Sequence, residues 1–179
     1  LQGLAMSSRK RARIAGEGEE EGEAVPVADG FEAPIFGARV VGQVTTLALE
    51  GEDGPLASQK LFAVASDRAG GWYVTTPASL LHVSAAGRIR TVATCEGCCG
   101  IALSPDGSAL FLADYSNHKI LRAEVATGAV STVAGSGEEG DADGMGDAAQ
   151  FNGPYGVTIS PDGSALFVAD FCKIRRVEV

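Results

Sequence analysis

The sequence predicts an all-β protein built from repeated sheets of four short antiparallel strands, the arrangement of a β-propeller. Residues 100–115 read GIALSPDGSALFLADY and residues 156–171 read GVTISPDGSALFVADF, so eleven of sixteen positions are identical at an offset of 56. Thr-Leu-Ala at 46–48 and Thr-Val-Ala at 91–93 and 132–134 recur at spacings of 45 and 41 residues. A unit of about 40 to 45 residues made of short strands is typical of a four-stranded propeller blade.

The first two strands of each clear unit are predicted by two apolar runs around Ser-Pro-Asp-Gly. In such a turn proline presets a negative φ, aspartate bonds its own backbone and glycine takes the left-handed position. The apolar run at 109–113 is continuous rather than alternating, which favours a strand buried on both faces. Each pair of runs is therefore predicted to form a hairpin. The turn residues are Pro105, Asp106 and Gly107 in one copy and Pro161, Asp162 and Gly163 in the other.

A polar corner and two further strands complete the predicted unit. Residues 114–118 form the corner, residues 119–125 alternate in character, and residues 129–134 form the last strand after a short turn. Asp114 and Asp170 occupy the same corner position in the two copies. Because a residue that recurs in each unit has a local role, we expect both carboxylates to accept hydrogen bonds from the turn that follows rather than to form a catalytic pair.

The stretch from residue 131 to residue 170 resembles the junction between NHL repeats, a family of β-propellers. Residues 149–156 read AQFNGPYG and match the Ala-x-Phe-Asn-x-Pro-x-Gly turn of that pattern, and Ala169-Asp170 matches its corner. Residues 117–120 read NHKI and are similar to the Asn-His-Arg-Ile that follows the corner in the family. The resemblance implies a six-bladed propeller that serves mostly as a binding platform and occasionally as an enzyme.

The resemblance and the strand count together predict half of a six-bladed ring behind a charged leader. The expected parts are a leader at 1–33 and a partial propeller at 34–179, made of a lone outermost strand at 44–49, a blade at 61–93, a second blade at 100–134 and an incomplete blade at 156–179. We expect a truncated product whose native form continues with further repeats. The rival is self-association, in which two copies form one ring and each lends its outermost strand to the other.

The leader contains few large apolar residues, so we expect it to be disordered. It has no apolar segment typical of a signal peptide or of a membrane span, which predicts an intracellular protein, cytoplasmic or nuclear. Its basic run has the density of a nuclear-import signal, although short basic clusters arise easily in such leaders, which favours a solvated tail. The run consists of Arg9, Lys10, Arg11 and Arg13.

Three of the four cysteines stand close together in the sequence. Cys95 and Cys98 have the spacing of half a structural zinc site, but no second pair and no suitably spaced histidine completes it. Cys98 and Cys99 fall where the chain enters an inner strand, which favours buried free thiols that behave as small apolar residues. We expect no metal and no cofactor, and the adjacent pair is the most reactive-looking place in the chain.

The long segment before the third unit is rich in Asp and Glu. Its D-x-D-G-x-x-D pattern is similar to the start of a calcium loop, but the bidentate glutamate of such loops is missing, so Asp143-Gly144 is interpreted as a turn. In a propeller this segment and the corners share one rim, where exposed aromatic residues are typical binding anchors. The expected binding residues are Glu138, Glu139, Asp141, Asp143, Asp147, Tyr115, Asn117 and Tyr155. For the two tyrosines, packing between blades is an equal alternative.

Charge and composition narrow the function. The net charge is −9, an acidic rim repels phosphate, and the dense positive patch of the propeller part is limited to Lys173, Arg175 and Arg176, which disfavours nucleic-acid binding. With two histidines and no Ser-His-Asp set or phosphate-binding motif, the sequence predicts a protein that is not an enzyme. We expect a protein–protein interaction scaffold with a basic or polar partner and no membrane contact. The alternatives are a metal-dependent hydrolase or lyase with catalytic residues beyond this sequence, and an RNA-binding NHL propeller.

Overall fold

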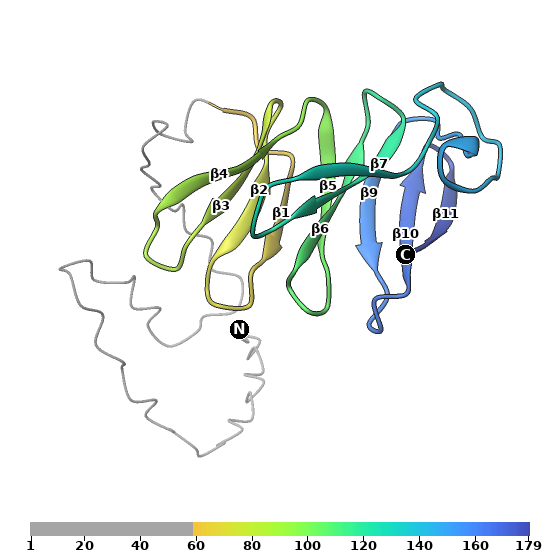
Figure 1. Cartoon of the computed structure of the whole chain (residues 1–179). Coiled ribbons are helices and arrows are strands. Elements are labelled where there is room, and N and C mark those ends of the chain that lie inside the picture. Colours follow the sequence, from red (N-terminus) through yellow and green to blue (C-terminus); the bar gives the residue numbers. More distant parts are fainter. Residues whose placement is uncertain (1–58) are drawn as a thin grey trace, which may run out of the picture. The chain divides into compact units, whose positions relative to one another are not determined.

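The computed structural model describes residues 59–179, which form three antiparallel sheets (Figure 1). The predicted leader, its basic run and the strand predicted at 44–49 lie outside the described residues. The strands are β1 (Ala63–Ser66), β2 (Trp72–Thr75), β3 (Ser79–Val83), β4 (Ile89–Thr94), β5 (Cys98–Leu103), β6 (Ala109–Asp114), β7 (Lys119–Glu124), β8 (Val130–Ala134), β9 (Pro154–Ile159), β10 (Ala165–Asp170) and β11 (Lys173–Glu178). A short 3-10 helix, η2 (Gly146–Ala148), lies between β8 and β9.

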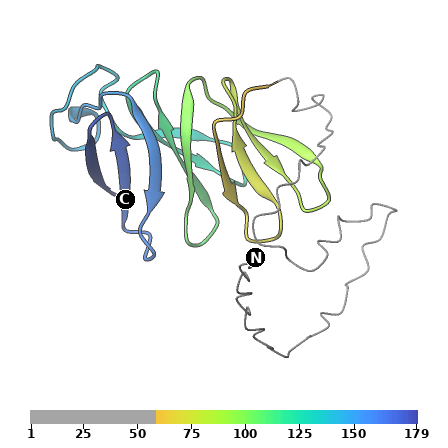
Figure 2. The ribbon, with the colours of Figure 1, turned by 180° about the vertical axis from the view of Figure 1, so that it is seen from behind.

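Each sheet is a meander in which strands that follow one another in the chain are hydrogen-bonded neighbours. The orders are β1-β2-β3-β4, β5-β6-β7-β8 and β9-β10-β11. Strand β5 packs against both β1 and β9, so the first strands of the three sheets lie next to one another, and the sheets follow in chain order in both views (Figures 1 and 2). This arrangement confirms the predicted fold class, because antiparallel blades whose innermost strands adjoin are the architecture of a β-propeller.

Strand β6 is the centre of the described core because both of its faces are covered. Leu110 and Leu112 pack into a cluster with residues of the first sheet, while Phe111 and Ala113 pack into a second cluster with residues of the third sheet. Every residue of β6 is buried. The continuous apolar run of the sequence therefore corresponds to a strand between two sheets. The equivalent strand β10 alternates instead, and its Phe167 is 40% exposed, against 2% for Phe111.

Both Ser-Pro-Asp-Gly segments form the tight turns between the first and second strands of their sheets. Gly107 has φ 76°, a left-handed conformation that strains a residue with a side chain. Asp106 Oδ1 accepts hydrogen bonds from the Ser104 hydroxyl at 2.6 Å and from a backbone N–H two residues on at 3.1 Å. These hydrogen bonds lower the pKa of Asp106 to about 2, and the bond from the Ser104 hydroxyl has the largest effect. Asp162 and Gly163 repeat the geometry in the third sheet.

The repeat offers a matched test of this packing. Phe111→Ala empties a fully buried position, so we expect the free energy of unfolding to fall by about 3–5 kcal/mol. Phe167→Ala removes the same side chain from a half-covered face, so we expect a loss of about 1–2 kcal/mol. Urea unfolding of the full chain, followed by far-ultraviolet circular dichroism, measures both. Equal losses would contradict the difference in burial.

Candidate functional site

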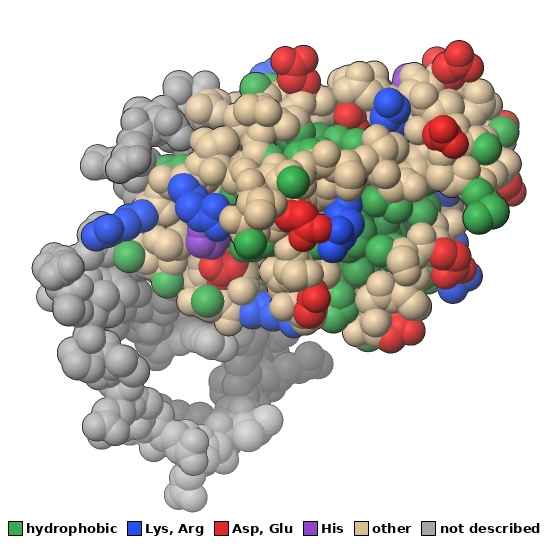
Figure 3. All heavy atoms as spheres, in the orientation of Figure 1, with side chains coloured by type: hydrophobic (Ala, Val, Ile, Leu, Met, Phe, Trp, Pro, Cys, Tyr) green, Lys and Arg blue, Asp and Glu red, His purple; other side chains and the backbone are tan. Residues whose placement is uncertain are grey.

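The candidate site is one rim of the propeller, where three connections meet. These are the turn 115–118 between β6 and β7, the segment 135–153 between β8 and β9, and the turn 171–172 between β10 and β11. Figure 1 shows all three on the side opposite the Ser-Pro-Asp-Gly hairpins. We call residues 115–118 and 135–155 the rim site, and residues 135–153 the acidic loop. Figure 3 shows acidic side chains over this part of the molecule.

Arg175 on β11 holds the acidic loop against the third sheet. Its Nη1 donates a hydrogen bond to the carbonyl oxygen of Gln150 at 2.9 Å. Its Nη2 donates to the carbonyl oxygen of Ala142 at 3.2 Å and to Oδ1 of Asp143 at 2.7 Å. The Arg175 side chain is only 11% exposed. One guanidinium therefore joins two distant parts of the loop to a single strand.

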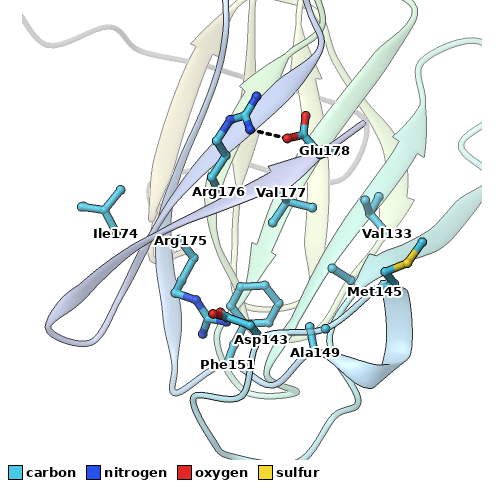
Figure 4. Close-up of a pocket in the computed structure, with 13 residues that line it drawn as sticks. Val133, Asp143, Met145, Ala149, Phe151, Ile174, Arg175, Arg176, Val177 and Glu178 are labelled. Atoms are coloured by element: carbon cyan, nitrogen blue, oxygen red, sulfur yellow. Dashed lines mark hydrogen bonds and ion pairs between the residues drawn. The ribbon is translucent and has the colours of Figure 1, made fainter.

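The same guanidinium also contacts two buried residues, Asp170 and Phe151. Arg175 Nη1 lies 3.3 Å from Oδ2 of the buried Asp170, and its guanidinium carbon lies 5.3 Å from the centroid of the Phe151 ring. Figure 4 shows Arg175 pointing toward Asp143 and Phe151, at the border of a groove of about 720 Å³. A cation this buried needs all of these partners, because an unpaired charge in such a place is strongly destabilising.

A second ion pair joins Asp141 of the acidic loop to Lys173 of β11. The hydrogen bond from Lys173 lowers the pKa of the Asp141 carboxyl, and the same bond raises the pKa of Lys173. The acidic loop and the basic strand, which look like separate charged surfaces in the sequence, are thus joined by two ion pairs, Asp141–Lys173 and Asp143–Arg175. Among residues 59–179, the acidic loop's Glu138, Glu139 and Asp147 are exposed and in no ion pair.

Tyr115 and Tyr155 lie together on the surface of the rim site. Their rings meet edge to face with centroids 6.2 Å apart, and they are 50% and 56% exposed. Tyr115 lies over Gly153, where an added Cβ would come within 2.8 Å of the ring. The two side chains therefore contact each other and remain about half exposed to solvent. They form a fixed aromatic surface beside the acidic loop.

The two corner aspartates, Asp114 and Asp170, accept hydrogen bonds from different segments in the two blades. Asp114 accepts hydrogen bonds from the backbone N–H of Asn117 at 3.1 Å and from its side-chain amide at 3.0 and 2.9 Å, so the corner carboxylate orients Asn117, which is exposed. Asp170 differs from the expectation, because it accepts from the backbone N–H of Asn152 at 2.7 Å, in the acidic loop. The turn that follows Asp170 has only two residues, 171–172, so it is too short for one of its backbone N–H groups to donate to the Asp170 carboxylate.

The acidic loop is also tied to the second blade. The backbone N–H of Gly153 donates to Nδ1 of His118 at 3.2 Å, and His118 itself has φ 55°. A Cβ at Gly135 would lie 2.4 Å from the carbonyl oxygen of His118, so only glycine allows the backbones to approach this closely. The loop is thus held by β11 on one side and by the 115–118 turn on the other.

The remaining candidate groups of the sequence analysis are placed as follows. Cys95, Cys98 and Cys99 are buried and Cys172 is exposed, and all four are free thiols. Asp141, Asp143 and Asp147 do not converge, and within the described part of the chain no three His, Cys, Asp or Glu side chains are grouped to hold a metal ion. In residues 59–179 no helix is long and apolar enough to cross a membrane.

A polar pair in the first blade escaped the sequence analysis. His82 is largely buried, and its Nε2 lies 2.8 Å from Oδ2 of Asp67. Oδ1 of Asp67 accepts the backbone N–H groups of Ala69 and Gly71, both at 2.8 Å. Burial raises the pKa of Asp67, but these hydrogen bonds outweigh it and lower the value overall. The pair closes the β1–β2 turn.

Comparisons with known proteins agree on the fold alone. No family model matches the chain. A stretch of 71 residues, 40% of the chain, is 41% identical to 6% of the Arabidopsis thaliana protein SUPPRESSOR OF QUENCHING 1, chloroplastic. Similar solved structures include a nidogen/laminin complex (19% identity, TM-score 0.56, 69% of this chain and 46% of that one) and Kuenenia stuttgartiensis hydrazine synthase (18%, 0.52, 79% and 36%). An auxiliary nutrient binding protein of Bacteroides thetaiotaomicron is a third (18%, 0.52, 60% and 34%).

These matches place the chain among β-propeller-like proteins. The identities to the solved structures are below one fifth, so the likeness concerns the path of the backbone and not the chemistry of a site. The chain spans less than half of each of these structures and a small part of the Arabidopsis protein. What those proteins bind or catalyse is therefore not carried by the shared fold.

The Arg175 anchor predicts an asymmetry between neighbouring arginines. Arg175→Ala leaves Asp170 buried without its cation and frees the loop, so we expect unfolding to become easier by about 3–5 kcal/mol and amide hydrogen exchange to rise across 138–153. Within residues 59–179, Arg176 forms an ion pair with exposed Glu178 alone, so Arg176→Ala is the matched control, with an expected change within about 0.5 kcal/mol. Similar effects of the two changes would show that Arg175 is not the anchor.

The Asp67 pair predicts a dependence on pH. A lowered pKa in the folded state means that the Asp67 carboxylate stabilises the fold above its ordinary pKa of about 3.9 and ceases to do so as the pH falls through the lower value. We expect Asp67→Asn to lose about 1–3 kcal/mol at pH 7 and progressively less below about pH 4. Asp147→Asn, at an exposed position, is the control. Urea unfolding across a pH series measures the difference, and a loss that persists undiminished in acid would contradict it.

Proposed function

We propose that the chain is part of an NHL-type β-propeller that binds a basic or polar protein partner through the rim site and carries out no chemistry itself. The NHL assignment is supported by what the residues of the Phe-Asn-x-Pro-x-Gly junction do. Phe151 is buried beneath Arg175, the backbone of Asn152 bonds Asp170, and Gly153 has φ 70°. Pro154 then begins β9. Phe151 and Gly153 thus each have a physical reason to be the residue that the junction pattern requires.

The observation that carries the proposal is an exposed tyrosine pair beside unpaired carboxylates on a fixed backbone. Position 137 adjoins the carbonyl oxygen of Asn117, which places Glu138 and Glu139 next to the turn that bears Tyr115. A lysine or arginine of a partner could contact an aromatic face and a carboxylate at once. Because Arg175 and His118 already hold the loop, binding requires little further ordering, which favours affinity.

Charge supports a basic partner over an acidic one. Lys173 and Arg175, which form most of the positive patch, are already engaged by Asp141 and Asp143. They are therefore less available for phosphate groups than the sequence suggested, and the free charges of the acidic loop are negative. A propeller rim of fixed loops suits recognition of a protein surface.

The relatives add limited support. One structural neighbour was solved as a complex of two proteins, nidogen and laminin. The Arabidopsis protein named SUPPRESSOR OF QUENCHING 1, chloroplastic, shares 6% of its length with this chain. We propose that the platform likewise acts as one module of a longer protein.

A charge-reversal experiment tests the platform. We expect Glu138→Lys/Glu139→Lys, or Tyr115→Ala/Tyr155→Ala, to lose at least about 1–2 kcal/mol of binding free energy toward partners captured by the intact wild-type chain. Asp141 and Asp143 are left unchanged, because their ion pairs also fix the loop.

The matched control is Glu124→Lys/Glu178→Lys. It changes the net charge by the same amount at the far ends of β7 and β11, in exposed ion pairs of little energetic weight. Affinity measured by biolayer interferometry at two salt concentrations should be retained in the control and lost in the rim variants. Equal binding by all variants would refute the rim site as the contact surface.

A further inference from the structure

An Asn-Gly pair, Asn152-Gly153, stands at the end of the acidic loop, directly before β9. The backbone nitrogen of a residue that follows asparagine can attack the carbonyl carbon Cγ of the asparagine side chain, because covalent connectivity keeps the two atoms close. A glycine in the second position favours this attack, since no Cβ hinders the approach and the backbone adopts a wide range of angles. The chain contains one other asparagine, Asn117, which is followed by His118.

The two asparagine side chains are held very differently. The Asn117 amide donates to both carboxylate oxygens of Asp114, at 3.0 and 2.9 Å. Within residues 59–179 the Asn152 side chain forms no hydrogen bond, and the residue is partly exposed. Its backbone N–H is held instead, by Oδ1 of Asp170 at 2.7 Å. The Asn152 carboxamide is therefore free to turn toward the backbone, and water can reach it.

His118 is placed to take the proton that such an attack must release. The backbone N–H of Gly153 points at Nδ1 of His118 over a distance of 3.2 Å. A backbone N–H can only donate, so Nδ1 is the unprotonated nitrogen of the ring and presents a lone pair. The N–H bond lies in the plane of the peptide group, whereas Cγ of Asn152 approaches the nitrogen from outside that plane. The base and the carbonyl carbon therefore do not compete for one side of the nitrogen.

We propose that Asn152 is a site of spontaneous deamidation in which His118 acts as the general base. Nδ1 takes the Gly153 amide proton as the nitrogen bonds to Cγ, and the side-chain nitrogen then leaves as ammonia after taking that proton from the imidazolium. The product is a five-membered succinimide ring. One water opens the ring at either carbonyl carbon and gives aspartate or isoaspartate. Water is consumed, ammonia is released and nothing is oxidised or reduced.

The product alters the rim site in charge and in shape. A neutral side chain at the end of the acidic loop becomes a carboxylate, beside the carboxylate of Asp170. Where the ring opens at the main-chain carbonyl, the backbone before Gly153 gains one methylene group. Gly153 packs so closely under Tyr115 that an added Cβ would lie 2.8 Å from the ring, and its N–H is bonded to His118. A longer backbone shifts both contacts, so the rim becomes more acidic and less tightly held with time.

The test follows the full chain as it ages at neutral pH and body temperature. Peptide mapping by mass spectrometry measures the conversion of each asparagine to an acid, and an enzymatic assay measures the ammonia released. We expect conversion at Asn152, in step with the ammonia, while Asn117 stays intact. An unmodified Asn152, or equal conversion at both asparagines, would overturn the proposal. Amide hydrogen exchange at Tyr115 and Gly153 should increase in the converted chain, and unchanged exchange would refute the effect on the rim.

A His118→Asn variant isolates the base. Asparagine tolerates the left-handed backbone at this position, where φ is 55°, and its side-chain oxygen can accept the same N–H, but an amide does not take up the proton. We expect the folded variant to convert Asn152 about a hundredfold more slowly than the parent, the lower end of what a positioned general base contributes.

Unfolding supplies the control for this comparison. In guanidinium chloride the contact between His118 and Gly153 is lost, so the parent and the variant should convert Asn152 at the same rate. A folded variant that reacts as fast as the folded parent would show that His118 is not the base. No binding partner enters any of these measurements, so their outcomes are independent of the proposed function.

Discussion

The rim depends on one buried cation. The Arg175 guanidinium donates hydrogen bonds to backbone carbonyl oxygens in two parts of the acidic loop and to a carboxylate of that loop. It also pairs with a carboxylate of β10 and lies over the ring of Phe151. A guanidinium in this position destabilises the fold unless all of its surroundings are in place, so the loop wraps around it instead of extending into solvent. Two of the acidic residues of the loop therefore stabilise its conformation through ion pairs with β11. Asp141 and Asp143 are the carboxylates that Lys173 and Arg175 pair.

Sequence reasoning succeeded where local rules decide the structure. The continuous apolar run of β6 is buried on both faces, and the Ser-Pro-Asp-Gly segments turn as aspartate and glycine dictate. It failed where partners are far apart in the chain. Arg175 and Asp143 are 32 residues apart, and the sequence alone does not show which carboxylate forms an ion pair with which cation. Asp67 and His82 were missed for the same reason, since neither lies in a motif.

The repeat also shows how far identical residues can differ in role. Phe111 is buried between two sheets, whereas Phe167, at the same repeat position, is partly exposed. Asp114 bonds the turn that follows it, whereas Asp170 bonds a loop that precedes its sheet. In both cases the repeat fixes the path of the backbone, and the neighbouring segment fixes what the side chain does. Sequence periodicity therefore predicts the blades well and the rim poorly.

The rim site belongs to a junction between blades and not to one blade. Tyr115 is held by Gly97 at the boundary of the first and second blades, and Tyr155 enters β9 of the third. The acidic loop between them is fastened to His118 on one side and to Arg175 on the other. The shape of the rim therefore depends on how the three blades pack against one another, more than on any one blade.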